Sequence, residues 1–252
     1  MPIRREFPPR SLDAADLRAG RVEPNYIKVL TRLLAAHALA EKLTALGYER
    51  ALAANQDETL RPTIEKNLAE ERKHARLVYR VLEQLGIMQA QADRIMISAV
   101  KGPSFDAPLY FAQKAAGELD LLMASLALDS TGLLMIGVNY KDSSYTPHAS
   151  AAEVILEEEQ DHDVFAAEQL GAAVARFGAK RVGAALRDWL PRAVNFFGPP
   201  GSGFTYECIR YGLKTRDNQD VAQLYTGMLA RRCDQLGVEL PQLTREYPYA
   251  LA

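Results

Sequence analysis

Helical periodicity is the feature of this sequence that most limits its fold. Apolar residues recur at three- and four-residue steps along four long stretches, at 24–54, about 62–85, about 107–131 and about 148–177. Shorter helical patterns follow at about 179–197, 203–215 and 218–236. No stretch shows the sustained two-residue alternation of a half-buried strand. The sequence therefore predicts an all-α protein.

The order of these patterns predicts the domain organisation. The long helices come first, so we expect a four-helix bundle over about 24–177 and a C-terminal helical extension over about 178–252. Together they make one domain, 24–252, and residues 1–23 form an N-terminal arm. The arm carries Arg4, Arg5 and Arg10 among prolines, which is typical of a solvated segment.

Two connections stand out between the long helices. The segment 87–106 ends in Lys-Gly-Pro-Ser and is interpreted as a connection with a short helix. The segment 132–147 contains several turn-forming residues and ends at a proline. We expect 132–147 to be irregular and to cap one end of the bundle.

Composition excludes several classes of protein. Hydrophobic residues make up 48% of the 252 residues, enough for a sizeable core, and the net charge of −2 argues against a nucleic-acid binder. The two cysteines, Cys208 and Cys233, form no CxxC motif and no disulfide framework. The first 25 residues have no signal-peptide core, and no run of 18 apolar residues occurs. We therefore expect a cytoplasmic protein that spans no membrane.

Two Glu-x-x-His pairs carry the chemistry. Glu71 and His74 lie in the second helical stretch, and Glu159 and His162 lie in the fourth. Residues three apart share one face of a helix, so each pair can reach the same metal ion. Both pairs also fall on the apolar stripe of their helix. A carboxylate there is costly unless it is paired, protonated or bound to metal.

The other two long helices each add one inward carboxylate. Glu41 follows the stripe of Leu30 and Leu34, and Glu118 lies between Phe111 and Leu122 at helical spacing. Four helices would then supply four carboxylates and two imidazoles. Ferritin-like bundles hold di-iron or di-manganese centres with this set: a glutamate from two helices and Glu-x-x-His from the other two.

Charge and ligand type agree with that interpretation. Four carboxylates carry four negative charges, which two divalent ions would neutralise. Oxygen and nitrogen ligands without thiolates suit iron or manganese better than structural zinc. Glu70 and Glu158 precede the ligand glutamates, and each is placed to accept a hydrogen bond from a histidine on another helix. The alternative for these two is a solvated helix face.

The remaining histidines receive no metal role. His37 lies on an apolar face, where a histidine is more often a satisfied core residue than a ligand. His148 follows Pro147 and is expected in a loop.

At these motifs the sequence resembles the phenylacetate-catabolism family, in particular the catalytic subunits of its di-iron epoxidase. The resemblance is carried by His37 with Glu41, Glu70–His74 running on to Leu85-Gly86, Glu158–His162, Trp189-Leu-Pro191, Phe197-Gly-Pro199, and Leu236–Pro241. It implies a ferritin-like fold and di-iron ligands at Glu41, Glu71, His74, Glu118, Glu159 and His162. The family has aspartate where Glu118 is matched.

The resemblance also implies an activity and partners. Such an enzyme uses O₂ to oxidise an aromatic ring held as a CoA thioester, together with a reductase and a related structural subunit or a second copy. The sequence departs from the family in a longer segment at 132–150. No cationic cluster for the CoA phosphates can be matched either, and candidates exist by charge alone at Lys66, Lys73, Lys101 and Lys114.

Other functions of ferritin-like bundles compete with this one. A ferroxidase or iron-storage protein would leave the extension after 178 unexplained. A radical-generating subunit needs a tyrosine one turn beyond the first histidine, where this chain has Val78. A manganese catalase would need no reductase. A non-catalytic structural subunit should have lost several ligands.

Overall fold

The computed structural model describes residues 3–54, 57–97, 105–113 and 118–240. Within these ranges helices are the regular secondary structure, and the one β-type contact is an isolated bridge between Leu12 and Tyr145. Four helices form the bundle: α2 (Pro24–Ala54), α3 (Arg61–Gln84), α6 (Glu118–Leu134) and α7 (Thr146–Phe177). The all-α prediction is confirmed.

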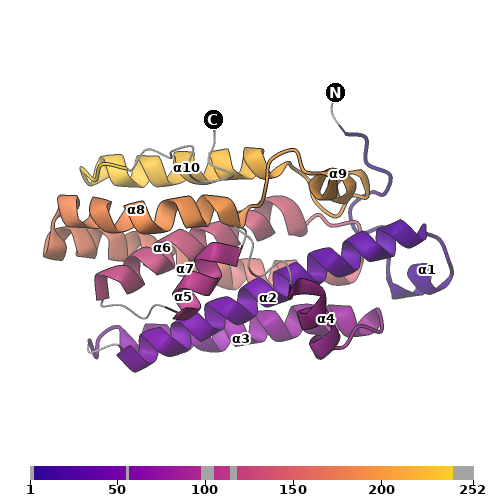
Figure 1. Cartoon of the computed structure of the whole chain (residues 1–252), viewed down its shortest axis with the longest axis horizontal. Helices are drawn as coiled ribbons and strands as arrows, with labels where there is room; N and C mark the ends of the chain where they lie inside the picture. Colours follow the sequence, from indigo (N-terminus) through magenta and orange to yellow (C-terminus); the bar gives the residue numbers. More distant parts are fainter. Residues whose placement is uncertain (1–2, 55–56, 98–104, 114–117, 241–252) are drawn as a thin grey trace.

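The long helices form two hairpins that pack into a bundle. Helix α2 packs along α3, α6 packs along α7, and α3 contacts α7. The other helices are α1 (Ala14–Arg18), α4 (Gln89–Met96), α5 (Asp106–Gln113), α8 (Ala179–Phe196), α9 (Gly203–Arg210) and α10 (Asn218–Gln235). Figure 1 shows α8 and α10 as further layers beside the bundle, and both contact α6. The extension therefore encloses α6 on sides that the hairpins leave open.

Helix ends follow local chemistry. Gly86 has a φ of +77° just after α3, and Gly178 has a φ of +82° between α7 and α8, so both occupy conformations that other residues rarely adopt. Asp217 caps α10, because its carboxylate accepts a hydrogen bond from the Gln219 amide at 2.9 Å. These signals explain why most predicted ends lie within two residues of the observed ones.

The predicted helix at 107–131 is divided in the structure. Helix α5 packs against α2 and α8, whereas α6 pairs with α7. The two pieces thus have different neighbours, which periodicity within one stretch does not reveal. The predicted short helix within 87–106 corresponds to α4, and residues 98–104 lie outside the described ranges.

The segment 132–147 is more regular than predicted. Helix α6 continues to Leu134 and passes into a π-helix, η2 (Met135–Tyr140). Met135, Ile136 and Tyr140 are buried there, and that burial favours a continued helix over a loop. Asn139 does not break the helix, because its buried side chain accepts hydrogen bonds from the backbone amides of the loop before α10.

The N-terminal arm is attached to the domain. Leu12, Leu17 and Val22 are buried in the common core. The Leu12 amide donates to the Ser144 carbonyl at 3.0 Å, and the Leu12 carbonyl accepts from the Thr146 amide at 2.8 Å. The expectation of a solvated arm therefore fails at these three apolar residues, whereas Arg4 and Arg10 are exposed as expected.

One described segment, Glu118–Tyr140, is long and apolar enough to cross a membrane by composition alone. Its most apolar window is 72% buried inside the protein, as expected for a central helix of a folded bundle.

Gly47 on α2 marks a close contact that a side chain would disturb. A Cβ at this position would lie 2.1 Å from Cδ1 of Phe111, whose ring packs edge-on against Tyr48 at 5.3 Å. We expect Gly47→Ala to lower the free energy of unfolding by about 1–3 kcal/mol, although alanine is the better helix former. Urea denaturation of the purified protein measures this difference.

Gly171→Ala in α7 is the matched control, because no atom lies within 4 Å of a Cβ built there. This variant should be neutral or slightly stabilising. Equal stability of the two variants would show that the Phe111 ring moves away without cost.

Candidate metal centre

Six ionisable side chains converge between the four long helices. All are buried: Glu41 from α2, Glu71 and His74 from α3, Asp129 from α6, and Glu159 and His162 from α7. Their ligand atoms form two groups, each with all atoms within 4.8 Å of one another. One group contains Glu41, Glu71, His74 and Glu159, and the other contains Glu71, Asp129 and His162. Because Glu71 belongs to both, the two groups could hold two adjacent cations that share a carboxylate.

Both histidines direct Nδ1 into this cluster. His74 Nδ1 lies 3.5 Å from Glu159 Oε1 and 3.7 Å from Glu41 Oε2. His162 Nδ1 lies 3.7 Å from Glu71 Oε1. The Glu-x-x-His spacing on α3 and α7 brings this about, because it places each histidine one helical turn after its glutamate and on the same face.

Two outer carboxylates orient these histidines. His74 Nε2 lies 2.9 Å from Glu158 Oε2, and His162 Nε2 lies 2.9 Å from Glu70 Oε2. Each pair crosses between α3 and α7, as the sequence predicted for Glu70 and Glu158. An Nε2–H that donates to a carboxylate leaves the Nδ1 lone pair free to face the cluster.

Several inward atoms have no partner in the described part of the chain. Glu71 Oε2, His74 Nδ1 and His162 Nδ1 are buried and accept no hydrogen bond. Leaving such atoms unsatisfied costs about 1–3 kcal/mol each. Metal ions placed among them would satisfy all three, and imidazole and carboxylate donors suit iron or manganese. The residues present therefore fit a two-metal centre.

The electrostatics of the cluster also favour cations. Burial raises the pKa of Glu71 and of Glu159 well above the usual range, and the charge of Glu41 raises both further. Burial likewise raises the pKa of Asp129 to about 7. Glu41 differs: burial opposes its ionisation, but His37 and His74 more than offset this and hold its pKa below the usual value. Bound cations would let all four carboxylates ionise together.

Glu118 does not join the cluster. It lies at the start of α6 with 22% of its side chain exposed, and it forms an ion pair with Arg176. Asp129, three turns further along α6, occupies the place predicted for Glu118. Its carboxylate accepts hydrogen bonds from Tyr48 Oη at 3.0 Å and from the Ser125 hydroxyl.

Two signals in the sequence could have identified Asp129. It precedes Glu159 by 30 residues (159 − 129), the same separation as between Glu41 and Glu71 (71 − 41). The family that the motifs resemble also has aspartate, and not glutamate, as the ligand that was matched to Glu118. Periodicity failed because every residue from Leu121 to Thr131 is buried, so no stripe distinguishes an inner face.

His37 and His148 extend the buried polar network from Glu41. His37 Nε2 lies 2.9 Å from Glu41 Oε1, and His37 Nδ1 lies 3.2 Å from His148 Nε2. His148 is fully buried in the first turn of α7, although the sequence placed it in a loop. The ring of Tyr140 packs against both imidazoles at about 5 Å. His37 therefore positions the Glu41 carboxylate, and His148 and Tyr140 position the His37 ring.

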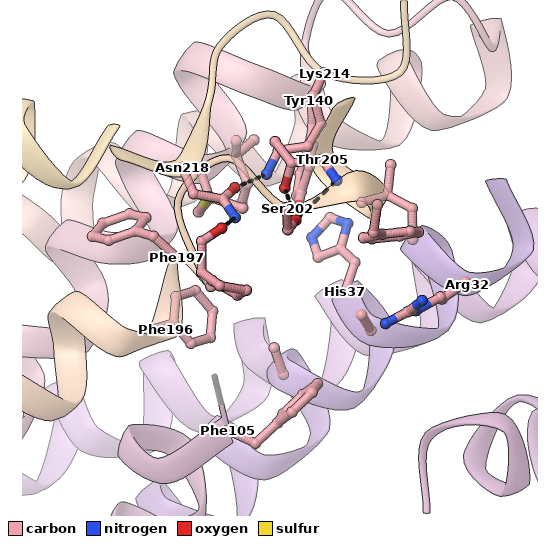
Figure 2. Close-up of a pocket in the computed structure, with 18 of the residues that line it drawn as sticks. Arg32, His37, Phe105, Tyr140, Phe196, Phe197, Ser202, Thr205, Lys214 and Asn218 are labelled. Atoms are coloured by element: carbon pink, nitrogen blue, oxygen red, sulfur yellow. Dashed lines mark hydrogen bonds between the residues drawn. The ribbon is translucent and has the colours of Figure 1, made fainter. Parts of the chain in front are cut away.

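A cavity of about 340 Å³ adjoins the cluster. Aromatic and aliphatic side chains form most of its wall, and Figure 2 shows Phe105, Phe196 and Phe197 around the space. Glu41, Gly132 and Phe196 line both this cavity and the small space between the carboxylates. A small apolar molecule in the cavity could therefore approach the candidate metal positions.

Gly132 leaves room for a ligand of the cluster. A Cβ at this position would lie 2.6 Å from Glu159 Oε2. We expect Gly132→Ala to displace the Glu159 carboxylate and to weaken metal binding about tenfold or more, with little change in the stability of the metal-free fold. Metal titration followed by calorimetry measures the affinity. Gly171→Ala should bind metal like the unmodified protein, and unchanged affinity in Gly132→Ala would exclude this crowding effect.

The fold and the buried cluster together define a class: a helical-bundle protein whose core can hold metal ions between carboxylates and histidines. The model of the phenylacetic acid catabolic protein family matches residues 62–248. The chain belongs to this family, which confirms the resemblance seen in its motifs. A search of curated proteins found no match. Family membership indicates a role in phenylacetate catabolism, as a subunit of a multi-subunit oxygenase.

Proposed function

We propose that this protein is the catalytic, metal-bearing subunit of a monooxygenase that uses two iron ions and O₂ to epoxidise or hydroxylate an aromatic substrate. The substrate class is an aromatic acyl compound, with the CoA thioester of phenylacetate as the leading example. Manganese is the alternative metal. The observation that carries the proposal is the complete set of six buried ligands with three unpaired inward atoms.

The residues of the cluster divide between two metal positions. Glu41, His74 and Glu159 would hold one ion, Asp129 and His162 would hold the other, and Glu71 is near both. Bound iron supplies the redox chemistry that dioxygen activation requires. Glu70 and Glu158 hold the histidine protons on the outer side of the site, and this keeps both Nδ1 atoms available.

The cavity supplies the second requirement of an oxygenase. Its apolar wall binds an aromatic ring and keeps water away from the reacting position. Neither a ferroxidase nor a manganese catalase needs a space of this size and polarity beside its metals. A structural subunit without catalysis has no reason to keep every ligand, so the intact set favours the catalytic role.

Electrons for the reaction have to come from outside the chain. The part of the chain that the structure describes has no CxxC or other thiolate cluster for an iron–sulfur centre, and both cysteines are buried singly. A separate reductase and a related structural subunit, or a second copy of the chain, are therefore the proposed partners.

One experiment tests the proposal directly. The protein is produced in iron-replete cells, its iron content is measured by elemental analysis, and it is then given reductant, phenylacetyl-CoA and isotopically labelled O₂. We expect bound iron and a product that has gained one labelled oxygen atom. A protein that binds no iron and no manganese would contradict the proposal, and peroxide dismutation without reductant would indicate a catalase instead.

A further inference from the structure

Lys214 is a buried cation in the wall of the cavity. Only 4% of the residue is exposed, and its ammonium donates one hydrogen bond, to Asn218 Oδ1 at 2.6 Å. No carboxylate of the described residues lies within ion-pair distance of it. An ammonium has three donors, so two of them remain for a ligand.

The backbone holds this lysine in place. It belongs to the turn between α9 and α10, where the Lys214 amide donates to the Cys208 carbonyl at 3.2 Å. The next amide, of Thr215, donates to Asn139 Oδ1 at 3.1 Å, and this bond ties the turn to the π-helix. Asn218 is fixed as well, because its Nδ2 donates to the Pro199 carbonyl at 2.9 Å. The pair is therefore set in position before any ligand arrives.

Neighbouring polar groups do not satisfy the lysine. The hydroxyls of Ser202 and Thr205 bond to each other at 2.9 Å. Asp217, the nearest acidic residue in sequence, accepts from the backbone amides of Gly201 and Gln219 instead. Burial lowers the pKa of Lys214, which agrees with an incompletely solvated cation. Such a group is rarely retained in an apolar wall without a partner.

Lys214 and Asn218 line the cavity but not the small space between the carboxylates, so the cationic part of the wall differs from the part shared with the metal cluster. Figure 2 shows Lys214 and Asn218 together on one side of the space, across from Phe105. Glu41, Gly132 and Phe196 form the part of the wall shared with the metal cluster. Arg32, the other cation of the lining, is exposed and stacks on the Phe204 ring at 4.2 Å, so it lies at the rim.

We propose that Lys214, held by Asn218, binds the acyl oxygen of the substrate and so leaves the aromatic ring to reach the part of the wall that is shared with the metal cluster. The inference rests on the proposed function, which makes the cavity the substrate site. Two sources share this chemistry: the carbonyl of an aryl-acyl thioester and the carboxylate of the free aryl acid. Both accept hydrogen bonds from an ammonium, and a bare aromatic hydrocarbon does not.

Binding measurements on the iron-loaded protein, without reductant or O₂, test whether Lys214 is an anchor for the acyl oxygen of the ligand. Phenylacetyl-CoA, phenylacetate and toluene are titrated calorimetrically into the unmodified protein and into Lys214→Met, which keeps the length of the side chain and removes its charge. We expect binding of the acyl ligand to weaken about tenfold or more and binding of toluene to stay unchanged. Lys180→Met, at the exposed start of α8, is the matched control and should bind all three normally.

A second measurement separates anchoring from a merely structural role. With a carbon-13 label at the acyl carbon, difference infrared spectroscopy reports hydrogen bonding to the bound acyl oxygen. We expect the carbonyl or carboxylate band to shift on binding, and we expect this shift to be lost in Lys214→Met and kept in Lys214→Arg. If Lys214→Met does not fold, Lys214→Gln takes its place in both measurements.

The outcomes distinguish this inference from the proposed function. Equal affinity of the unmodified protein and Lys214→Met for the acyl ligand, or failure of both acyl ligands to bind, would overturn the anchor even if the protein oxygenates an aromatic compound. Loss of affinity in Lys214→Met together with absent oxygenation would instead keep the anchor and reject the proposed reaction. The affinities for phenylacetate and for its thioester show which source of acyl oxygen the site prefers.

Discussion

Replacing Asp129 with alanine is expected to remove at least one of the two proposed metal ions and to abolish the proposed oxygenase activity. Asp129 is the α6 member of the group formed with Glu71 and His162. Its loss leaves that position with one shared carboxylate and one imidazole, too few ligands to hold an iron ion. The fold should survive, because the carboxylate is costly to bury in the metal-free state and its removal relieves that cost.

Glu118→Ala is the matched control on the same helix. It removes a carboxylate that pairs with Arg176 at the half-exposed start of α6, and it should retain full metal content and activity. Surface ion pairs contribute about 0–1 kcal/mol, so stability should change little. Elemental analysis of both variants, made in the same iron-replete cells, gives the comparison. Full iron in Asp129→Ala with loss in Glu118→Ala would restore the assignment that the sequence first favoured.

The second large effect concerns the metal-free protein. Its free energy of unfolding should be smaller at pH 8 than at pH 5, because the buried carboxyl groups of the cluster resist ionisation. Burial raises the pKa of Asp129 from 3.8 to about 7 in the folded state. A carboxyl group with a raised folded pKa contributes most below its unfolded pKa, and this contribution is lost as the pH rises through about 7. A shift of this size corresponds to about 4 kcal/mol.

Asp129→Asn isolates this effect, because the amide does not ionise. The free energy of unfolding of each metal-free protein is measured by urea denaturation between pH 5 and pH 8. We expect the variant to gain about 3 kcal/mol of stability relative to the unmodified protein between pH 5 and pH 8, because the part of the effect below pH 5 lies outside this range. Glu41 titrates in the opposite sense, but its contribution is lost only as the pH falls below its usual value of 4.5, outside this window.

Metal binding should remove the penalty at high pH. Cations stabilise the ionised carboxylates, so the metal-loaded unmodified protein should gain stability as the ligands lose their protons. The metal-free comparison has a clear contrary result: a stability difference between Asp129→Asn and the unmodified protein that does not change with pH. That result would mean that the Tyr48 and Ser125 hydrogen bonds already compensate the buried charge.

Much of this protein follows from its sequence. Helices α2, α3, α7, α8 and α10 begin and end within about two residues of their predicted bounds, because proline, glycine and capping residues act over a few positions. The Glu-x-x-His pairs were recognisable for a similar reason. Helix geometry alone places residues three apart on one face, and on α3 and α7 the apolar stripe shows which face is buried.

Tertiary structure decided the features for which local pattern has no information. Helix α6 is surrounded by α7, α8 and α10, so every face of it is buried from Leu121 to Thr131, and only packing selects Asp129 over Glu118. The π-helix, the burial of His148 and the placement of Lys214 beside the cavity all depend on contacts between segments far apart in the chain. A sequence specifies which side chains are costly to bury. Only the assembled fold shows which of these buried polar side chains lie together, and therefore what kind of ligand can offset the cost of burying them.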